Sequence, residues 1–313
     1  MLARTPGRTV GRVWMRLLTP AAAAAALLVL TIGVPANAAG PLVGDDGVAR
    51  SGTYTADVVP AWKARLLVLH GMQQAGTMSA ADAAEWNAII DAQGIDPTSR
   101  FTDATASPSG SITPMANYTS NDLTGTQKPQ LRGNWCGPAS AQSIVLAWHN
   151  EVSWPTSSAL DGQSLSQAAL ATATYTNAGP AGGTDWVDHD MTRALNNWLV
   201  AGGGSLYVQY TPTSVTLLQN HVALDIDIDY MMASDMSEVI NGSHYNYHPN
   251  QLIYHWTTIR GYASSGATFH FQDPAANTTV LGTAWANVAP YFSMSSASTY
   301  SFMTHNVTRG IAW

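Results

Sequence analysis

The sequence contains a single cysteine and few charged residues. One cysteine among 313 residues excludes a disulfide within the chain, so the stability of the fold must come from packing. Charged residues make up only 11% of the chain, with 20 acidic against 13 basic side chains. Because nucleic acids and anionic membrane surfaces both favour a basic face, this shortage of basic charge argues against either as a partner.

Long apolar runs are also scarce, and the one candidate lies at the N-terminus. Residues 1–38 combine four arginines, an apolar run from Ala21 to Val34, and the small-x-small pattern at 36–38, an order typical of a secretory signal peptide. The run is shorter than the ~20 residues that a membrane span needs, although an uncleaved signal anchor is an alternative interpretation. We therefore expect cleavage near Ala39, a secreted, extracellular protein and no stable membrane association. Nine basic and 20 acidic residues would then remain, a net charge of −11.

Residues 39–101 are predicted to form a helical segment. Apolar side chains recur at helical spacing over 60–74, and a second helix is expected over 80–93, with Ser79 as N-cap and Asp82 in the first turn. Residues 102–126 are rich in Ser, Thr, Asn, Gly and Pro, which indicates a polar linker. Two interpretations stay open: an inhibitory propeptide in cis that is cut off in this linker, or a helical extension packed permanently on the main domain, 127–313.

The single cysteine lies at the expected start of a helix. Gly137 and Pro138 follow Cys136, and proline suits the first helical position, so we predict a helix from Pro138 to a point before Pro155. A thiol at the positive end of a helix dipole is favoured as thiolate. This context indicates a nucleophile, whereas the alternative is a small buried apolar residue.

The middle of the chain alternates predicted helices and strands. Helices are expected over 164–175 and 185–200, and a short strand over 206–210. In 221–230 apolar residues alternate with three aspartates at 225, 227 and 229, which predicts a half-buried strand with a solvated acidic face. A calcium loop is disfavoured, because Tyr230 stands where that pattern needs glycine and Met236 where it needs glutamate.

Two histidines follow with zinc-like spacing. His244 and His248 would be ligand neighbours on a helix, but Gly242, Asn246 and Pro249 make a helix unfavourable there. We interpret both as loop histidines and predict no metal site.

A hairpin near the C-terminus brings a histidine and an aspartate together. Residues 252–262 and 267–272 are rich in β-branched and aromatic side chains and flank a Ser-Ser-Gly turn. A turn centred near Ser265 places His255 opposite Asp273 or Pro274. Cross-strand neighbours lie about 5 Å apart at Cβ, so the Asp273 carboxylate should reach the His255 ring. This pair supplies a base and its orienting group, or an ordinary surface pair.

Together these residues resemble the bacteriocin-processing, double-glycine-leader type of papain-like cysteine peptidase. The resemblance covers about 127–313 and rests on Gln130, on the run Cys136-Gly137-Pro138-Ala139, on His255 with the strand after it, and on Asp273-Pro274. No phosphate-binding P-loop or membrane domain accompanies them, so the chain is similar to the stand-alone secreted branch. No Gly-Gly pair occurs between Ala39 and Cys136, so self-cleavage in the linker would need another specificity.

The resemblance implies an α+β, papain-like fold, with an N-terminal helical part that carries the cysteine and a C-terminal antiparallel sheet that carries the histidine and aspartate. It implies Cys136 as nucleophile, His255 as general base and then acid, Asp273 as orienter of the ring, and Gln130 as donor to the oxyanion. The implied substrate is a peptide or protein, with no metal and no cofactor.

Two tryptophans flank the implied site. Trp135 and Trp256 are candidates to line a substrate groove, and core packing is the alternative for each. Three functions stay open: a peptidase, an amidase or acyl transferase on the same site, and a non-catalytic binding module in which Cys136 is inert.

Overall fold

The computed structural model describes residues 42–43, 49–50, 57–95, 119–148, 155–179, 182–201 and 204–313. These ranges fall within one compact unit, Ala39–Trp313. The predicted signal peptide and most of the predicted linker lie outside the described residues. None of the helices that the structure describes is long and apolar enough to cross a membrane.

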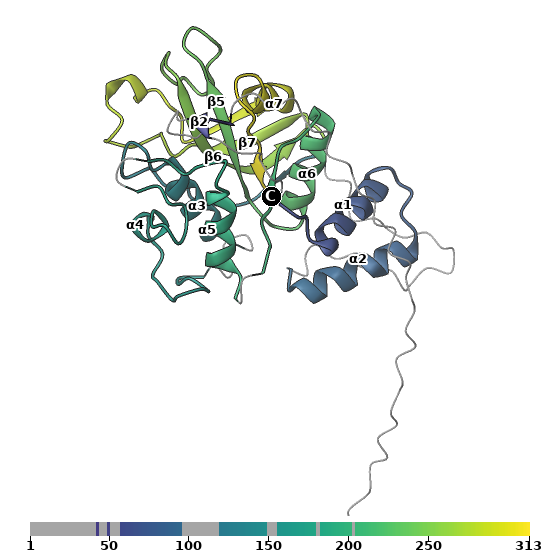
Figure 1. The fold of residues 1–313 in the computed structure, drawn as a ribbon. Coiled ribbons are helices and arrows are strands. Elements are labelled where there is room, and N and C mark those ends of the chain that lie inside the picture. Colours follow the sequence, from purple (N-terminus) through teal and green to yellow (C-terminus); the bar gives the residue numbers. More distant parts are fainter. Residues whose placement is uncertain are drawn as a thin grey trace, which may run out of the picture. The chain divides into compact units, whose positions relative to one another are not determined.

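A seven-stranded sheet, antiparallel at every pairing, forms the centre of the unit (Figure 1). Its strands follow the order β4 (Gln209–Tyr210), β9 (Ile311–Ala312), β5 (Met232–Glu238), β6 (Ile253–Ala263), β7 (Thr268–Gln272) and β8 (Tyr291–Ser295), and β3 (Asn121–Asp122) pairs with the end of β6. Two short strands, β1 (Leu42–Val43) and β2 (Ala49–Arg50), pair separately. Because β6 is the longest strand and pairs with three others, it is the element on which a site can be built most rigidly.

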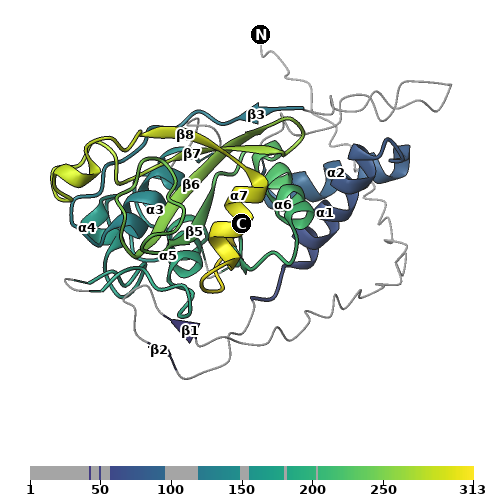
Figure 2. The same ribbon diagram turned by 90° about the horizontal axis from the view of Figure 1, so that it is seen from above.

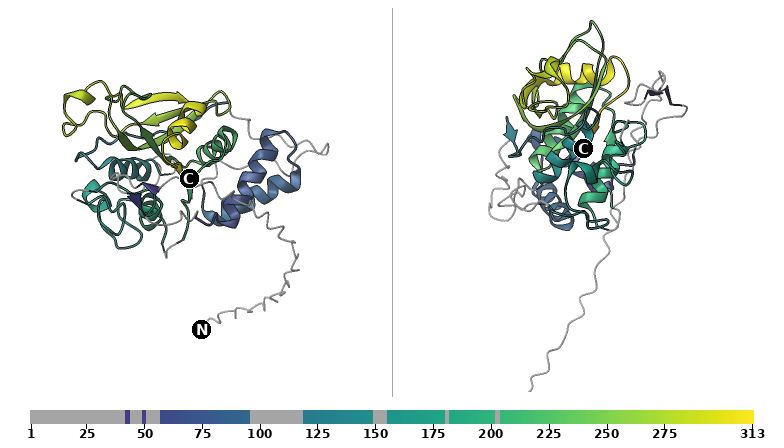
Figure 3. Two further views of the ribbon diagram at one scale, coloured as in Figure 1. Left: turned by 45° about the horizontal axis from the view of Figure 1, so that its top comes forward. Right: turned by 90° about the vertical axis from the view of Figure 1, so that its left-hand side faces the viewer.

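Some helices pack against this sheet, and others pack on those helices. The described helices are α1 (Ala61–Gln74), α2 (Ala80–Gln93), α3 (Cys136–Leu146), α4 (Gln167–Leu170), α5 (Asp190–Leu199), α6 (Val215–Asp227) and α7 (Ser296–Thr304), together with a 3-10 helix at Thr283–Trp285. Both α3 and α6 contact β6, and α1 contacts α6 (Figure 2). Helix α7 contacts β5 and β8, and α1 pairs with α2 (Figure 3). The α+β class is therefore confirmed.

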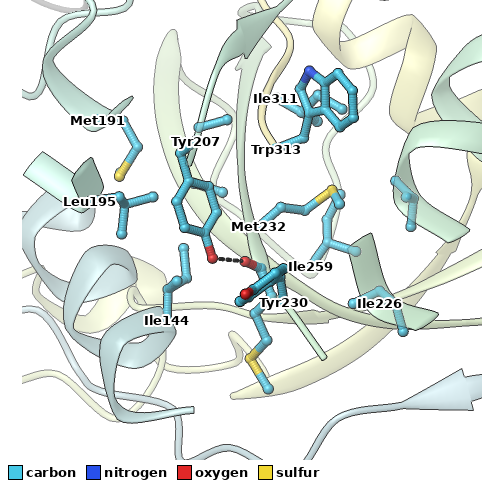
Figure 4. Packing of buried hydrophobic residues seen from close by; sticks show 14 of the residues in the cluster. Ile144, Met191, Leu195, Tyr207, Ile226, Tyr230, Met232, Ile259, Ile311 and Trp313 are labelled. Atoms are coloured by element: carbon cyan, nitrogen blue, oxygen red, sulfur yellow. Dashed lines mark hydrogen bonds between the residues drawn. The ribbon is translucent and has the colours of Figure 1, made fainter. Parts of the chain in front are cut away.

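The main core joins side chains of α1, α2, α3, α5, α6 and α7 with those of the sheet, and Figure 4 shows part of it. Ile144 of α3, Leu195 of α5 and Ile259 of β6 are at most 1% exposed, a burial that contributes about 1.5–3 kcal/mol for each such side chain. The one polar atom of the Tyr207 ring is satisfied there, because its hydroxyl donates to the Met231 carbonyl at 2.6 Å. This packing fixes α3 against β6.

Local signals in the sequence predict some elements well and others poorly. Helices α1 and α2 match the predicted ranges, and Ser79 and Asp82 form a complete capping box at the start of α2. Helix α3 begins at Cys136 rather than Pro138, because two further residues already have helical geometry. Helices α4 and α5 and strand β4 are shorter than the predicted 164–175, 185–200 and 206–210.

The prediction of a strand over 221–230 is wrong. Helix α6 begins after Ser214, whose side chain caps it by accepting from the Leu217 N–H. Asp225 is fully buried and Asp227 is 6% exposed, so the acidic face is not solvated. The period-2 pattern was misleading because the partners that make these aspartates tolerable lie on α1, more than 150 residues earlier in the chain.

Helix α1 is tied to α6 by a buried ion pair and a buried hydrogen bond. Lys63 Nζ lies 3.1 Å from Asp225 Oδ2, with both side chains at most 1% exposed. His70 Nε2 lies 3.0 Å from Asp227 Oδ2, and Leu66 and Leu69 of the same helix join the main core. No described residue of α1 or α2 lines the cleft described below. Helix α1 is therefore packed on the main domain, and whether the segment is later removed stays a prediction.

The end of the predicted linker also belongs to the fold. Residues 121–122 form β3, which pairs with Gly261 and Tyr262 of β6, and Leu123 is buried. The prediction of an exposed connection up to residue 126 is therefore wrong for this part, because main-chain pairing with β6 organises it.

The buried Lys63–Asp225 pair gives the first prediction. Lys63→Ala should lower the free energy of unfolding by about 3–5 kcal/mol, since it leaves an uncompensated buried charge on Asp225. The matched control is Arg65→Ala on the same helix, whose pair with Glu85 is solvent-exposed and should contribute no more than about 1 kcal/mol. Urea titration measures both. Equal, small changes in the free energy of unfolding of the two variants would show that the stability of the fold does not depend on the Lys63–Asp225 pair.

Candidate active site

Cys136 is the first residue of α3 and is nearly buried, at 9% exposure. The first N–H groups of a helix have no acceptor within the helix, so the backbone around the thiol is electropositive. The absence of a side chain at Gly137 allows the helix to start at this position. A Cβ at this position would lie 1.9 Å from Thr184 Oγ1, so only glycine lets the turn approach the 182–186 segment so closely.

His255 lies on β6, and Asp273 directly follows β7. The register pairs Thr258 with Gln272, so the residue numbers sum to 530, within one residue of the value that the hairpin predicts. His255 Nε2 lies 2.8 Å from Asp273 Oδ1, and the Ala275 N–H donates to the same oxygen at 2.9 Å. The predicted contact is therefore present, although the observed register, continued beyond the strand, would place residue 275 and not Asp273 directly opposite His255.

The Cys136 thiol lies near the His255 ring and is one of the groups that raise the pKa of this ring. Since Nε2 faces Asp273, Nδ1 is the ring nitrogen left for the sulfur. Burial lowers the pKa of His255, but the charge and hydrogen bond of Asp273 and the nearby Cys136 outweigh it and raise this pKa to about 9. Burial likewise raises the pKa of Asp273, but the charges and hydrogen bonds of His255 and His248 hold it well below its usual range. The buried ring is therefore an imidazolium at neutral pH.

A second set of polar side chains surrounds Asp273, and the sequence did not predict it. His248 lies in the loop between β5 and β6, as expected, but its Nε2 lies 2.9 Å from Asp273 Oδ2. Asn246 Nδ2 donates to the same oxygen at 2.7 Å, and Glu238 Oε1 lies 2.5 Å from His248 Nδ1. The only sequence signal was the pair of histidines spaced by four with a carboxylate just before them.

One group in this site also has the composition of a metal site. His248, His255 and Asp273 each offer a ligand atom, and these atoms lie within 4.8 Å of one another. The same atoms are already used in the hydrogen bonds of the two rings to the carboxylate. In the structure these three residues form a hydrogen-bonded network.

Cys136 and His255 line a cleft of about 260 Å³. The other described residues that line it are neutral, and they include Gln130, Leu252 and Trp285. Trp285 belongs to the 3-10 helix, and its ring centroid lies 6.3 Å from that of His255. Cys136 and His255 therefore open onto the same cleft, among neutral side chains.

Trp135 and Trp256 do not line this cleft, so the structure gives no support to the prediction that they bind substrate. Trp135 packs in a small buried cluster, and its Nε1 donates to the Gly179 carbonyl at 3.3 Å. Trp256 is 1% exposed and donates to the Thr184 carbonyl at 2.8 Å. Because neighbouring side chains on a strand point to opposite faces, Trp256 faces away from the side that carries His255. Core packing, the alternative, holds for both.

Gln130 lines the cleft but does not direct its amide protons into it. Its Nε2 donates to the carbonyls of Arg132 and Gly133, each at 2.9 Å, which uses both protons. Its buried Oε1 has no hydrogen-bond partner among the described residues. The implied role as oxyanion donor therefore requires the side chain to turn, and it stays a prediction.

Comparisons with known proteins bear on this geometry. The model of a family described as the Peptidase_C39 like family matches residues 117–299, a range that includes Cys136, His255 and Asp273. Neither the search of curated proteins nor the search of solved structures finds a match. The family match covers more than half of the sequence. The chain therefore belongs to the Peptidase_C39 like family.

Proposed function

We propose that this protein is a cysteine peptidase that cleaves peptide bonds with Cys136, His255 and Asp273 on a papain-like fold. The family supports a cysteine peptidase in general. The observation that carries the specific assignment is the row formed by Cys136, His255 and Asp273: Cys136 and His255 line one cleft, and His255 Nε2 lies 2.8 Å from Asp273 Oδ1.

The chemistry follows from this row. The Cys136 thiolate attacks the carbonyl carbon of the scissile bond, and the carbonyl oxygen takes up the negative charge of the tetrahedral intermediate. The His255 imidazolium then gives its proton to the leaving amine as the C–N bond breaks, which leaves a thioester on Cys136 and a neutral ring. The ring next takes a proton from water, whose oxygen attacks the thioester. The C–S bond then breaks as the acid product leaves, which restores the thiolate and the imidazolium. Asp273 stays ionised and holds the ring throughout.

The oxyanion needs donors at the start of α3. The Cys136 N–H belongs to the first turn of the helix, and Gln130 supplies a second donor when one of its two bonds to the carbonyls of Arg132 and Gly133 is released.

Gln130→Ala tests this role. We expect kcat to fall by about 10²–10³-fold with a small change in KM, since an oxyanion donor acts mainly in the transition state. Thermal unfolding of the variant is the control, because Gln130 also holds two carbonyls of the loop before Cys136. An unchanged kcat in a folded variant would remove Gln130 from the mechanism.

Digestion of a peptide mixture of broad composition distinguishes the peptidase from its alternatives. A peptidase creates new amino and carboxyl termini, which mass spectrometry maps. An amidase releases ammonia without new termini, and an acyl transferase yields products only when an amine acceptor is added. A binding module changes none of the peptides. New termini that require Cys136 support the proposal, and any of the other three results contradicts it.

A further inference from the structure

Asp273 is held on both of its oxygens, and each oxygen has two donors. Oδ1 faces His255 and the Ala275 N–H, while Oδ2 faces His248 at 2.9 Å and Asn246 at 2.7 Å. The carboxylate itself is fully buried. An orienting residue in a three-member site needs only the contact to the catalytic ring, so the Oδ2 side calls for its own explanation.

His248 lies between two carboxylates. Its Nε2 faces Asp273 Oδ2, and its Nδ1 faces Glu238 Oε1 at 2.5 Å. An ionised carboxylate can only accept hydrogen bonds, so both ring nitrogens must carry protons and the ring is an imidazolium. Burial lowers the pKa of His248, but its hydrogen bonds to Asp273 and Glu238 outweigh this and raise it to about 9.

Glu238 and the loop after it are themselves fixed. Glu238 ends β5 at 2% exposure, and its second oxygen lies 2.7 Å from His244 Nδ1. Asn246 has a left-handed backbone, with φ of 46°, and its side chain also bonds to the main chain of Ala289. A non-glycine residue in this conformation persists only where its surroundings impose it. The loop is thus built to present His248 to Asp273.

We propose that His248 and Glu238 are positioning residues of the active site: His248 holds Asp273 against His255, and Glu238 holds His248 and balances its charge. The inference rests on the proposed function of Cys136, His255 and Asp273. It extends the site to a row of five side chains, from Cys136 through His255, Asp273 and His248 to Glu238.

Few other titratable groups face His248 among the described residues. The Tyr245 ring lies 4.5 Å away, and burial raises its pKa well above its usual value, so it is neutral. Asp235, also on β5, is paired with Arg309 at 2.8 Å. His244 contacts Glu238 and not the His248 ring nitrogens. The Trp285 ring covers His248 at 4.9 Å and carries no charge.

Substitution of His248 and substitution of Glu238 should therefore shift the pH at which the Cys136 thiolate forms in opposite directions. The His248 and His255 ring centroids lie 5.1 Å apart, so the positive charge of His248 favours loss of a proton from its neighbours. His248→Gln keeps an amide donor for Asp273 but removes that charge, so the Cys136 thiolate should form at higher pH. Glu238→Gln removes a negative charge while Asp273 still keeps His248 protonated in acid, so the thiolate should form at lower pH.

Alkylation by iodoacetamide measures the pH at which the Cys136 thiolate forms, and it needs no substrate. Cys136 is the only cysteine, so the rate of adduct formation against pH, followed by mass spectrometry, reports this residue alone. We expect the acid midpoint to rise by about 1 pH unit in His248→Gln and to fall by a similar amount in Glu238→Gln. The control is His305→Gln, because His305 is exposed at the end of α7, and its midpoint should equal that of the wild type.

Unchanged midpoints in both folded variants, or shifts in the same direction, would overturn the inference. A purely structural role would change the alkylation rates but would not shift the two midpoints in opposite directions. If circular dichroism shows that one variant does not fold, the sign of the shift in the other decides. A wild type whose only midpoint lies near pH 8.5, as for an ordinary cysteine, would instead contradict the proposed function itself.

Discussion

Cys136→Ala is expected to lower peptide hydrolysis by about 10⁴-fold or more and to leave the fold intact. The loss is large because no other side chain in the cleft can form the covalent intermediate: the chain has no second cysteine. The fold should tolerate the change because Cys136 is small and lies at the start of α3, where alanine occupies nearly the same space. Turnover of a peptide substrate measures the loss.

Cys136→Ser is the matched variant. It keeps the shape of the side chain, but a serine hydroxyl does not lose its proton to His255 as a thiol does, so it should be nearly as inactive as alanine. Circular dichroism and the urea midpoint should equal those of the wild type in both variants. Turnover that survives either substitution would leave Cys136 as a buried structural residue and the enzyme unassigned.

His255→Ala should lower turnover by about 10³–10⁴-fold, and Asp273→Asn by a smaller factor. Loss of the ring removes both the partner of the thiolate and the acid for the leaving amine. An asparagine can still accept from His255 Nε2, but it cannot balance the imidazolium charge.

Asp273→Asn should also lower the free energy of unfolding. Its NH₂ group would face donors from His248 and Asn246, because both carboxylate oxygens accept hydrogen bonds in the native structure. We expect a loss of about 1–3 kcal/mol, measured by urea titration beside the kinetics. His270→Ala is the control, since His270 contacts Asp122 at 2.6 Å in an exposed pair outside the site. Wild-type activity in both His255→Ala and Asp273→Asn would show that they are not the catalytic pair.

The sequence predicted those features of the site that depend on short-range geometry. The hairpin register depends only on the turn position, so the positions of His255 and Asp273 along the chain are enough to predict their contact. The prediction of Ser79 as an N-cap is confirmed for the same reason, since capping residues and the N–H groups they satisfy lie within one turn.

The predictions that failed concern features that depend on residues far away in the sequence. Three aspartates at alternate positions resemble a solvated strand face unless Lys63 and His70 are known to lie against two of them. His248 resembled an ordinary loop residue because Glu238 and Asp273, which define its role, come from two different strands of the sheet. Buried polar networks of this kind leave no periodic signal. Export and removal of residues 1–38 stay predictions, because that segment lies outside the described residues.

The most direct test of the catalytic assignment compares alkylation of Cys136 by iodoacetamide at pH 6 in native and urea-denatured protein. An ordinary cysteine in an unfolded chain is only roughly 0.3% thiolate at this pH. If His255 and Asp273 hold Cys136 as a thiolate, the native protein should react at least about tenfold faster than the denatured protein, and His255→Ala should remove this advantage. A native rate equal to or below the denatured rate would contradict the assignment of Cys136 as the nucleophile.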